Sequence, residues 1–132
     1  YSINPDLGVA IDADLATDFP GMDKKKEGEI KVGAGPVLFR GPNINPKLGE
    51  MLIKIAEENN IPYQLAGESR ATPTDANVIQ ISRAGVAAAL VSIPVRYLHT
   101  PVELLSVSDV ENAIKLLSLF VLRLEKDNFI PF

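Results

Sequence analysis

Two apolar runs constrain the fold of this chain more than any other feature of its sequence. Residues 7–11 form a continuous apolar run that stops at Asp12, and residues 86–95 form a second and longer run. Continuous apolar runs of strand length predict strands that are covered on both faces. Segments with helical spacing separate the runs, and strands that alternate with helices indicate a layered α/β sheet with parallel pairing between some neighbours.

Three helices are predicted from spacing and capping signals. Asn45 is expected to cap the first, with Pro46 at its first position and Asn59 near its end. Its apolar face is formed by Leu48, Met51, Leu52, Ile55 and Ala56. A second helix is expected to run from Thr74 or Asp75 to Gly85, because glycine commonly closes helices.

A long C-terminal helix is the third. Ser108 and Glu111 have the capping-box spacing, which predicts the start of this helix. Its expected apolar face consists of Val110, Ala113, Ile114, Leu117, Val121 and Leu124. Shorter extended stretches are predicted within residues 29–39 and 62–67, and residues 18–29, with lysines at 24–26, have the composition of an exposed loop.

The bulk properties indicate one globular domain without a split. The 132 residues are 46% hydrophobic and 23% charged, and the net charge is -4 with both signs interspersed. No basic stripe is present, so nucleic acid is not an expected partner. The longest apolar run is shorter than the roughly 20 residues of a membrane span, and no signal peptide is recognised. The absence of cysteine excludes disulfides and thiol catalysis and fits the cytoplasm as the expected location.

Two residues are candidate metal ligands. Asp12 ends a predicted buried strand, and the carboxyl ends of strands are where α/β sheets place ligand sites. His99, the single histidine, follows the second central strand. Each also has an ordinary interpretation, Asp12 as a turn cap and His99 as a structural histidine. Together an oxygen and a nitrogen ligand suit zinc, cobalt or manganese, but three protein ligands per zinc are usual, so further ligands are expected from outside this chain.

Other catalytic motifs are missing from the sequence. No Gly-x-Ser-x-Gly elbow is present, which disfavours a serine hydrolase. Gly33 and Gly35 precede a proline and lack the third glycine and helix of a dinucleotide fingerprint, so they are interpreted as a turn. Neither a P-loop nor an EF-hand loop occurs.

Four segments resemble the tetrahedral, or deblocking, glutamyl aminopeptidases, which are two-metal peptidases, in the same order as in that family. They lie within residues 5–21, 33–36, 74–86 and 92–103, and the last, with its Arg-Tyr-Leu-His-Thr-Pro-Val-Glu run, is the most specific. The resemblance extends over residues 3–124, and some relatives carry an endoglucanase label. It implies a zinc-peptidase-like fold: a three-layer α/β sandwich with a mixed, mostly parallel sheet flanked by helices.

The resemblance also implies roles for individual residues. Asp12 and His99 match ligands of different metals in that family. Thr74 and Asp75 match a turn close to the site and are expected to orient ligands or position substrate. Arg96 and Tyr97 are expected to do the same or to serve packing. The sequence departs from the family at Pro73, where glycine is common, and at Asp14, where threonine is common.

The resemblance further implies that residues 1–132 are the C-terminal part of a catalytic domain. The family's His-x-Asp motif, bridging Asp, Glu-Glu pair with the general base, and inserted dimerisation domain are absent from this sequence. The expected function is removal of N-terminal residues from peptides by water activated by two divalent ions, zinc or cobalt, with no catalytic general base in this chain.

The expected partners are peptides, the missing N-terminal part and further copies of the chain in an oligomer. Two alternatives stay open. One is a non-catalytic module that packs or binds a partner. The other is a carboxypeptidase or deacylase with the same sheet, which the residue 96–103 run disfavours.

Overall fold

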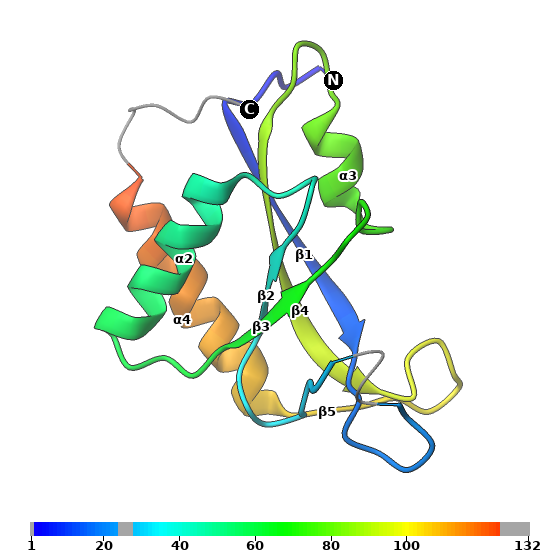
Figure 1. Ribbon diagram of the computed structural model, residues 1–132. Helices are drawn as coiled ribbons and strands as arrows, with labels where there is room; N and C mark the ends of the chain where they lie inside the picture. Colours follow the sequence, from blue (N-terminus) through cyan, green and yellow to red (C-terminus); the bar gives the residue numbers. More distant parts are fainter. Residues whose placement is uncertain (1, 24–27, 125–132) are drawn as a thin grey trace.

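The structure of the protein is a computed structural model that describes residues 2–23 and 28–124 (Figure 1). The predicted lysine run at 24–26 lies outside the described residues. In chain order the elements are β1 (Leu7–Leu15), β2 (Val37–Arg40), α2 (Pro46–Glu58), β3 (Gln64–Gly67), α3 (Asp75–Gln80), β4 (Ala87–Arg96), β5 (Leu104–Leu105) and α4 (Val107–Arg123). Among the described residues, no helix has the length and apolar character to cross a bilayer.

β4 is the strand on which the sheet is built. The strand order is β1-β4-β2-β3, and β5 pairs with β4 beyond β2. β1 pairs with β4 in parallel from Leu7 opposite Ala87 to Leu15 opposite Val95. β2 and β3 are also parallel, whereas β2 and β5 run antiparallel to β4. The expected mixed, mostly parallel sheet is therefore confirmed.

Pro94 lies inside β4, although proline cannot donate a ladder hydrogen bond. The pairing with β2 ends at Ser92 and the pairing with β5 begins at Val95. Pro94 thus falls in the interval between two short partners on the same side of β4. Proline is tolerated where no neighbouring strand requires its N–H, so a central strand can contain it here.

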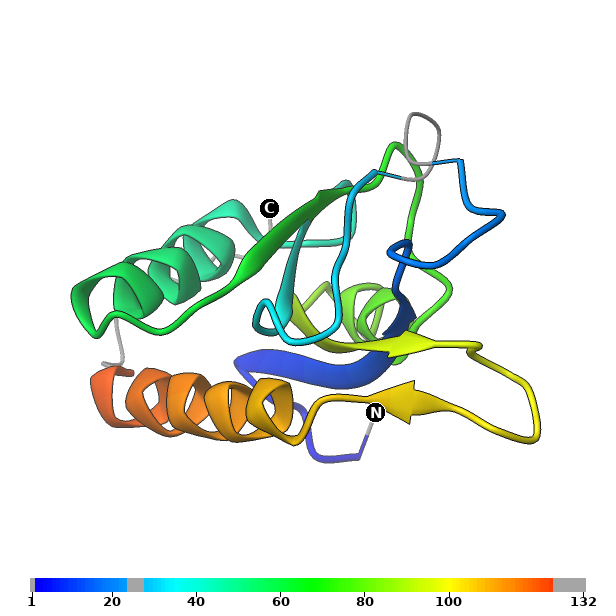
Figure 2. The same cartoon turned by 90° about the horizontal axis from the view of Figure 1, so that it is seen from below.

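Helices cover both faces of the sheet, which confirms the three-layer arrangement. α2 and α4 lie side by side against one face (Figures 1 and 2). Their buried side chains form one core with the sheet: Leu38, Leu48, Leu52, Ile55, Ala56, Ile61, Ala87, Ala89, Val91, Ala113, Leu116 and Phe120. On the other face, Ala76 of α3 packs with Ala10, Val37, Phe39 and Leu90 in a smaller core.

α2 forms as its sequence predicts. The Asn45 side chain accepts a hydrogen bond of 3.2 Å from the Leu48 N–H, and Pro46 occupies the first turn. At the other end Asn59 is the C-cap and its side-chain amide donates to the Ile55 carbonyl. Asn60 then adopts a left-handed φ of 51°, which ends the helix. Local capping and apolar spacing agree here, so the sequence was sufficient.

The predicted bounds of α3 and α4 are wrong. α3 ends at Gln80, and Gly85, with a φ of 103°, instead closes a later turn in which its N–H donates to the Ser82 carbonyl. α4 begins at Val107 with Ser106 as its N-cap, so the capping box that starts at Ser108 does not form. In the first turn of α4, a buried carboxylate accepts hydrogen bonds from backbone N–H groups of the loop before β2. This long-range contact takes precedence over the local capping box.

That acceptor is Asp109, which is fully buried in the first turn of α4. Its carboxylate accepts hydrogen bonds from the N–H groups of Gly33 and Gly35, at 2.7 and 2.8 Å. A carboxylate near a helix N-terminus is also stabilised by the helix dipole. The Gly33 turn is therefore fixed to α4, a long-range contact that no short sequence pattern shows.

The expectation that residues 7–11 form a strand covered on both faces is wrong. β1 continues through Asp12 to Leu15 and lies at the edge of the sheet. Ile11 is 64% exposed, on the same face as Leu7 and Val9, which pack against the α2 and α4 core. A continuous apolar run does not by itself show which strand is central.

The buried face of α4 also differs from the prediction. Ala113, Leu116 and Phe120 face the core, because α4 packs against α2 as well as against the sheet. Ile114 and Val121, expected in the core, are 60% and 64% exposed. Val107, Ile114 and Val121 recur every seven residues and form an exposed apolar stripe, which we call the α4 stripe.

Replacing Asp109 with Ala is expected to lower the free energy of unfolding by about 3 kcal/mol, because two buried N–H groups lose a charged acceptor. Asp109→Asn, which keeps one carbonyl oxygen, should lose less. Urea unfolding followed by circular dichroism measures both. Glu111→Ala, at an exposed position of the same helix, serves as the control. Equal stability of the Asp109→Ala and Glu111→Ala variants would contradict this role.

The outer edge of β1, which has no partner strand in the part of the chain that the structure describes, and the α4 stripe predict that the 132-residue chain self-associates. Exposed strand edges and apolar surface favour contact with another chain. Sedimentation velocity should show a concentration-dependent oligomer. Ile11→Lys combined with Ile114→Glu should shift it toward the monomer. Ile81→Glu changes an equally exposed apolar residue after α3 and should not. A monomer at high concentration for the unmodified chain refutes this prediction.

Candidate functional site

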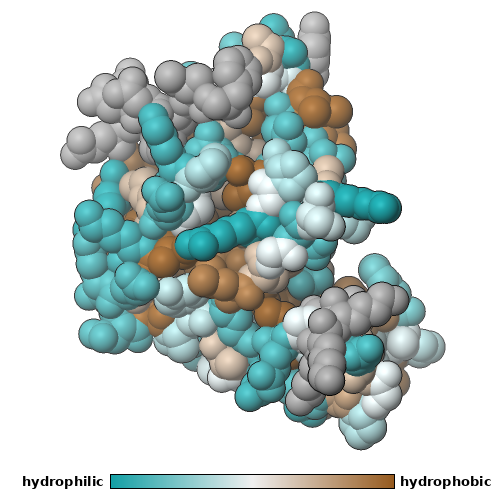
Figure 3. All heavy atoms as spheres, in the orientation of Figure 1, coloured by the Kyte–Doolittle hydropathy of each residue, from teal (hydrophilic) through white to brown (hydrophobic). Residues whose placement is uncertain are grey.

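One open cavity brings three of the predicted site residues together. It has a volume of about 230 Å³ and is lined by Asp12, Ala13, Asp14, Phe39, Glu68, Thr72, Pro73, Thr74, Leu90, Ser92, Leu98 and His99. Figure 3 shows the surface indented between the body that carries α3 and the lobe formed by the loops at the ends of β1 and β4. We call this cavity, with the lining residues given above, the Asp12–His99 cavity.

Asp12 reaches the cavity through the alternation of β1. Residues two apart in a strand share a face, so Asp12 and Asp14 point to the same side of the sheet. Ser92 of β4 lies opposite Asp12 in the parallel register and lines the same cavity. One oxygen of the exposed Asp12 carboxylate accepts a hydrogen bond from the Ala13 N–H at 2.8 Å. Asp12 thus lies within β1 instead of at its end.

His99 is placed by a strained turn after β4. Tyr97 and His99 have left-handed φ values of 60° and 63°, which cost roughly 1–2 kcal/mol each for residues with a Cβ. The Thr100 hydroxyl hydrogen-bonds to the Tyr97 carbonyl, and the His99 N–H donates to the Glu103 carboxylate at 2.7 Å. Strain of this kind concentrates at functional sites, where the surrounding contacts maintain it.

Thr74 lines the cavity as the N-cap residue of α3, whereas Asp75, the first residue of that helix, does not. The Thr74 hydroxyl hydrogen-bonds to that of Thr72 at 2.8 Å. Thr72 is buried, and both its hydroxyl and its N–H bond to the Asn43 side chain. This chain of side-chain contacts fixes the segment that closes one side of the cavity. Pro73, the departure from the family, lies within it.

Arg96 and Tyr97 do not line the cavity. The Arg96 guanidinium forms two hydrogen bonds, of 2.8 and 2.7 Å, to the Asp18 carboxylate. Asp18 also accepts from the Val32 N–H. The hydrogen bond from Arg96 holds the pKa of Asp18 below its ordinary value, and Asp18 raises the pKa of Arg96. The Tyr97 ring contacts the Phe19 ring, with centroids 5.2 Å apart. Both residues therefore attach the loop after β1 to the turn that carries His99.

Three cavity residues were missed by sequence reasoning. Asp14 was noted only as a departure from the family, although its two-residue spacing from Asp12 placed it on the same face. Burial raises its pKa, and the nearby Glu68 and Asp12 carboxylates add to this effect. Glu68 follows β3, and no local signal brings it to β1. Ser92 belongs to the most specific segment of the resemblance but was given no role.

The residues present fit part of a metal site. Within residues 2–23 and 28–124, no group of three His, Cys, Asp or Glu side chains is arranged to hold a cation. Asp12 and His99 nevertheless place a carboxylate and an imidazole on one open cavity. The buried Ser92 hydroxyl beside them has no hydrogen-bond partner. Such a donor set suits a cation only if other groups complete the coordination.

The fold is shared with members of a known peptidase family. The model of the M42 glutamyl aminopeptidase family matches residues 1–116, and the chain belongs to that family. It is 42% identical over 133 residues to a lysyl aminopeptidase of Pyrococcus furiosus, a match that covers 99% of this chain and 37% of that relative. The chain therefore spans little more than a third of the length of this relative.

Solved structures agree with the family assignment. An aminopeptidase from the archaeon Desulfurococcus kamchatkensis has a TM-score of 0.85 at 40% identity, covering 98% of this chain and 39% of its own. A structure described as a putative peptidase/endoglucanase has a TM-score of 0.74 at 38% identity. This match covers 95% of this chain and 36% of the other. The TET1 peptidase of Pyrococcus horikoshii has a TM-score of 0.66 at 27% identity. This match covers 88% of this chain and 33% of the peptidase. The expected resemblance, including the endoglucanase label, is confirmed.

Replacing Arg96 with Ala is expected to destabilise the fold at neutral pH, because the Asp18 carboxylate loses both hydrogen bonds. The pKa of Asp18 lies below its ordinary value of 3.8 in the folded protein. The stabilisation is therefore complete above that value and is lost as the pH falls through the lowered pKa. Urea unfolding from about pH 7 to about pH 2 measures the difference between variant and wild type.

Arg70→Ala is the control for this experiment, since Arg70 is exposed and has no ion pair among the described residues. A difference between Arg96→Ala and wild type that stays constant over the whole pH range would show that the ion pair is not its cause.

Proposed function

We propose that the intact protein is a metal-dependent aminopeptidase that removes N-terminal residues from peptides, and that this chain supplies part of its active site. The observation that carries the proposal is the position of Asp12 and His99 on one open cavity of an aminopeptidase fold. Open coordination positions are what a catalytic metal site needs, in contrast to a closed structural site.

Asp12 and His99 are proposed to hold different ions of a pair of divalent cations, zinc or cobalt. When bound, such a pair lowers the pKa of a water and polarises the scissile carbonyl. The Ala13 N–H engages one oxygen of Asp12 and thereby orients its carboxylate. The turn held by Thr100 and Glu103 orients His99. The general-base Glu is proposed to come from the N-terminal part of the catalytic domain, outside this chain.

The other predicted residues are proposed to act by position. Thr74 lines the cavity and is proposed to contact substrate or a metal-bound group, with Asp75 supporting it from the start of α3. Arg96 and Tyr97 are proposed to orient His99 through the loop contacts with Asp18 and Phe19. Groups that orient ligands in this way influence metal affinity without touching the metal.

Assembly and location belong to the same proposal. The P. horikoshii TET1 peptidase is described as assembling into a tetrahedron or a large octahedral shell. We propose that the intact protein forms a homo-oligomer as well, with peptides as its substrates. A cytoplasmic location stays a prediction.

A non-catalytic module is the second candidate. One observation favours it, namely that the described residues contain no group of three potential ligands able to hold a metal. Calorimetry of the 132-residue chain with zinc distinguishes the two candidates in part. Tight binding that disappears in Asp12→Asn and His99→Gln variants would favour the metal site.

In the intact enzyme, Asp12→Asn and His99→Gln are expected to lower kcat/KM on aminoacyl-nitroanilides at least about 100-fold, since loss of a metal removes several kcal/mol and each 1.36 kcal/mol is tenfold. Metal analysis should show lower metal content in both variants. Glu111→Gln is the control.

The 132-residue chain alone is expected to show negligible turnover with added metal. Turnover by the isolated chain would contradict the partial site, and full activity of both variants in the intact enzyme would refute the metal roles.

A further inference from the structure

One buried hydroxyl in the Asp12–His99 cavity has no hydrogen-bond partner. Ser92 of β4 lines this cavity and is 1% exposed. Within residues 2–23 and 28–124, its Oγ is the buried side-chain polar atom that bonds to nothing. Buried hydroxyls are nearly always bonded, because an unpaired one has lost its hydrogen bonds to water. Ser92 therefore destabilises the free protein and is satisfied only when a partner reaches it.

The walls around Ser92 are apolar. Leu90, two residues earlier on the same face of β4, is 1% exposed, and Phe39 of β2 is 5% exposed. Both line the cavity. Across the antiparallel pairing with β2, Ser92 lies opposite the fully buried Val37. These side chains cannot accept or donate a hydrogen bond, so a partner for Ser92 has to come from the β1 side or from a ligand.

Asp12 is the carboxylate that the sheet places beside Ser92. The two residues are direct partners in the parallel register, so their side chains leave the same face from strands about 5 Å apart. Asp14, the next carboxylate on this face of β1, lies opposite Pro94 instead. A serine hydroxyl moves among three staggered positions by rotation about one bond. The Ser92 hydroxyl can therefore turn toward Asp12 without any change in the backbone.

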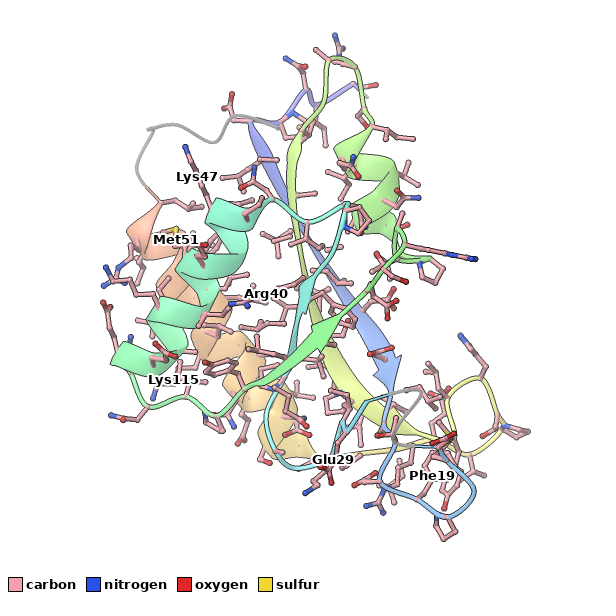
Figure 4. The ribbon with its side chains drawn as sticks, in the orientation of Figure 1. Phe19, Glu29, Arg40, Lys47, Met51 and Lys115 are labelled. Carbon is pink, nitrogen blue, oxygen red and sulfur yellow. The ribbon has the colours of Figure 1, made fainter. Side chains whose placement is uncertain are left out.

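One oxygen of Asp12 is available for this bond. The Ala13 N–H engages the first carboxylate oxygen, and the second has no hydrogen-bond partner among the described residues. No ion pair in the same part of the chain involves Asp12, and the Arg40 side chain extends toward α2 (Figure 4). The free carboxylate is exposed, so water supplies its remaining hydrogen bonds. A carboxylate that holds a cation loses part of this water and gains from a protein donor that orients it.

We propose that Ser92 is a positioning residue of the metal site, and that its hydroxyl donates a hydrogen bond to the Asp12 carboxylate when Asp12 holds a divalent cation. The bond limits rotation of the carboxylate and satisfies the hydroxyl that the free protein leaves unpaired. Only a difference between the free and bound states changes affinity. Ser92 destabilises the first state and stabilises the second, so both effects strengthen cation binding. This inference rests on the proposed role of Asp12 as a metal ligand.

The stability of the metal-free chain gives the first test. Ser92→Ala removes the unpaired hydroxyl and is expected to raise the Tm of the 132-residue chain in EDTA by about 2–4 °C, measured by circular dichroism. Ser118→Ala is the matched control, since the exposed Ser118 hydroxyl already donates to the Ile114 carbonyl, and it should not raise the Tm. A lower or unchanged Tm for Ser92→Ala would show that the hydroxyl has a partner in the free protein, such as a bound water, and would overturn the proposal.

The zinc affinity of the intact enzyme gives the second test. Competition with a chelating dye is expected to show a Kd for zinc that is roughly tenfold higher in Ser92→Ala than in the wild type, as is typical when a group that orients a metal ligand is lost. Ser118→Ala should keep the wild-type Kd. A wild-type Kd in Ser92→Ala overturns the proposal.

A double-mutant cycle separates this inference from the proposed function. If Ser92 acts through Asp12, Ser92→Ala should not raise the zinc Kd further in the Asp12→Asn background. A tenfold rise in both backgrounds would show that Ser92 acts independently of Asp12, and would overturn the inference. A higher Kd in Asp12→Asn together with a wild-type Kd in Ser92→Ala leaves the metal role of Asp12 in place and overturns the inference alone. A wild-type Kd in both single variants overturns the proposed metal site and the inference together.

Discussion

The parallel register between β1 and β4 is the constraint on which the rest of the structure depends. It pairs Asp12 with Ser92 and Asp14 with Pro94 along the whole of β1. Because side chains alternate, a slip of one residue would turn both carboxylates to the opposite face, toward the α2 and α4 core. The packed residues of β1 oppose such a slip, since Leu7 and Val9 pack against one core and Ala10 lies in the other.

The site is assembled on this sheet by loops that polar contacts hold in place. Asp18 and Arg96 connect the loop after β1 to the turn that carries His99. Asn43 and Thr72 fix the segment that carries Thr74. Few of these contacts join close neighbours in sequence. A cavity edge of this kind is therefore specified by tertiary packing and hydrogen bonding, with the rigid sheet as its support.

The sequence predicted those parts of the fold that depend on local signals. The cap of α2 by Asn45 and the strand predicted over residues 86–95, which is β4 at Ala87–Arg96, follow from short patterns. The start of α4 did not, because Asp109 bonds to Gly33 and Gly35 from a distant loop and the capping box is replaced. Likewise the central or edge position of a strand depends on its neighbours, which is why the exposure of Ile11 was not predicted.

The candidate site was predictable to a similar extent. Asp12 and His99 stood out because each follows apolar residues of a strand, and the resemblance to a family gave them roles. Asp14 was accessible to the same reasoning through its spacing from Asp12. Glu68 was not, since it arrives from beyond β3 through a segment without regular structure.

β1 combines two different surfaces in one strand. Asp12 and Asp14 face the cavity, whereas Ile11 lies on the opposite side, and the outer edge of the strand has no partner strand within residues 2–23 and 28–124. Under the proposed function, adjacent residues of β1 therefore serve different purposes, since Asp12 and Asp14 face the candidate site and Ile11 is available for contact with another chain. A substitution at Ile11 therefore changes a surface on the opposite side of β1 from Asp12 and Asp14, whereas Leu7 and Val9, on the same face as Ile11, pack against the α2 and α4 core.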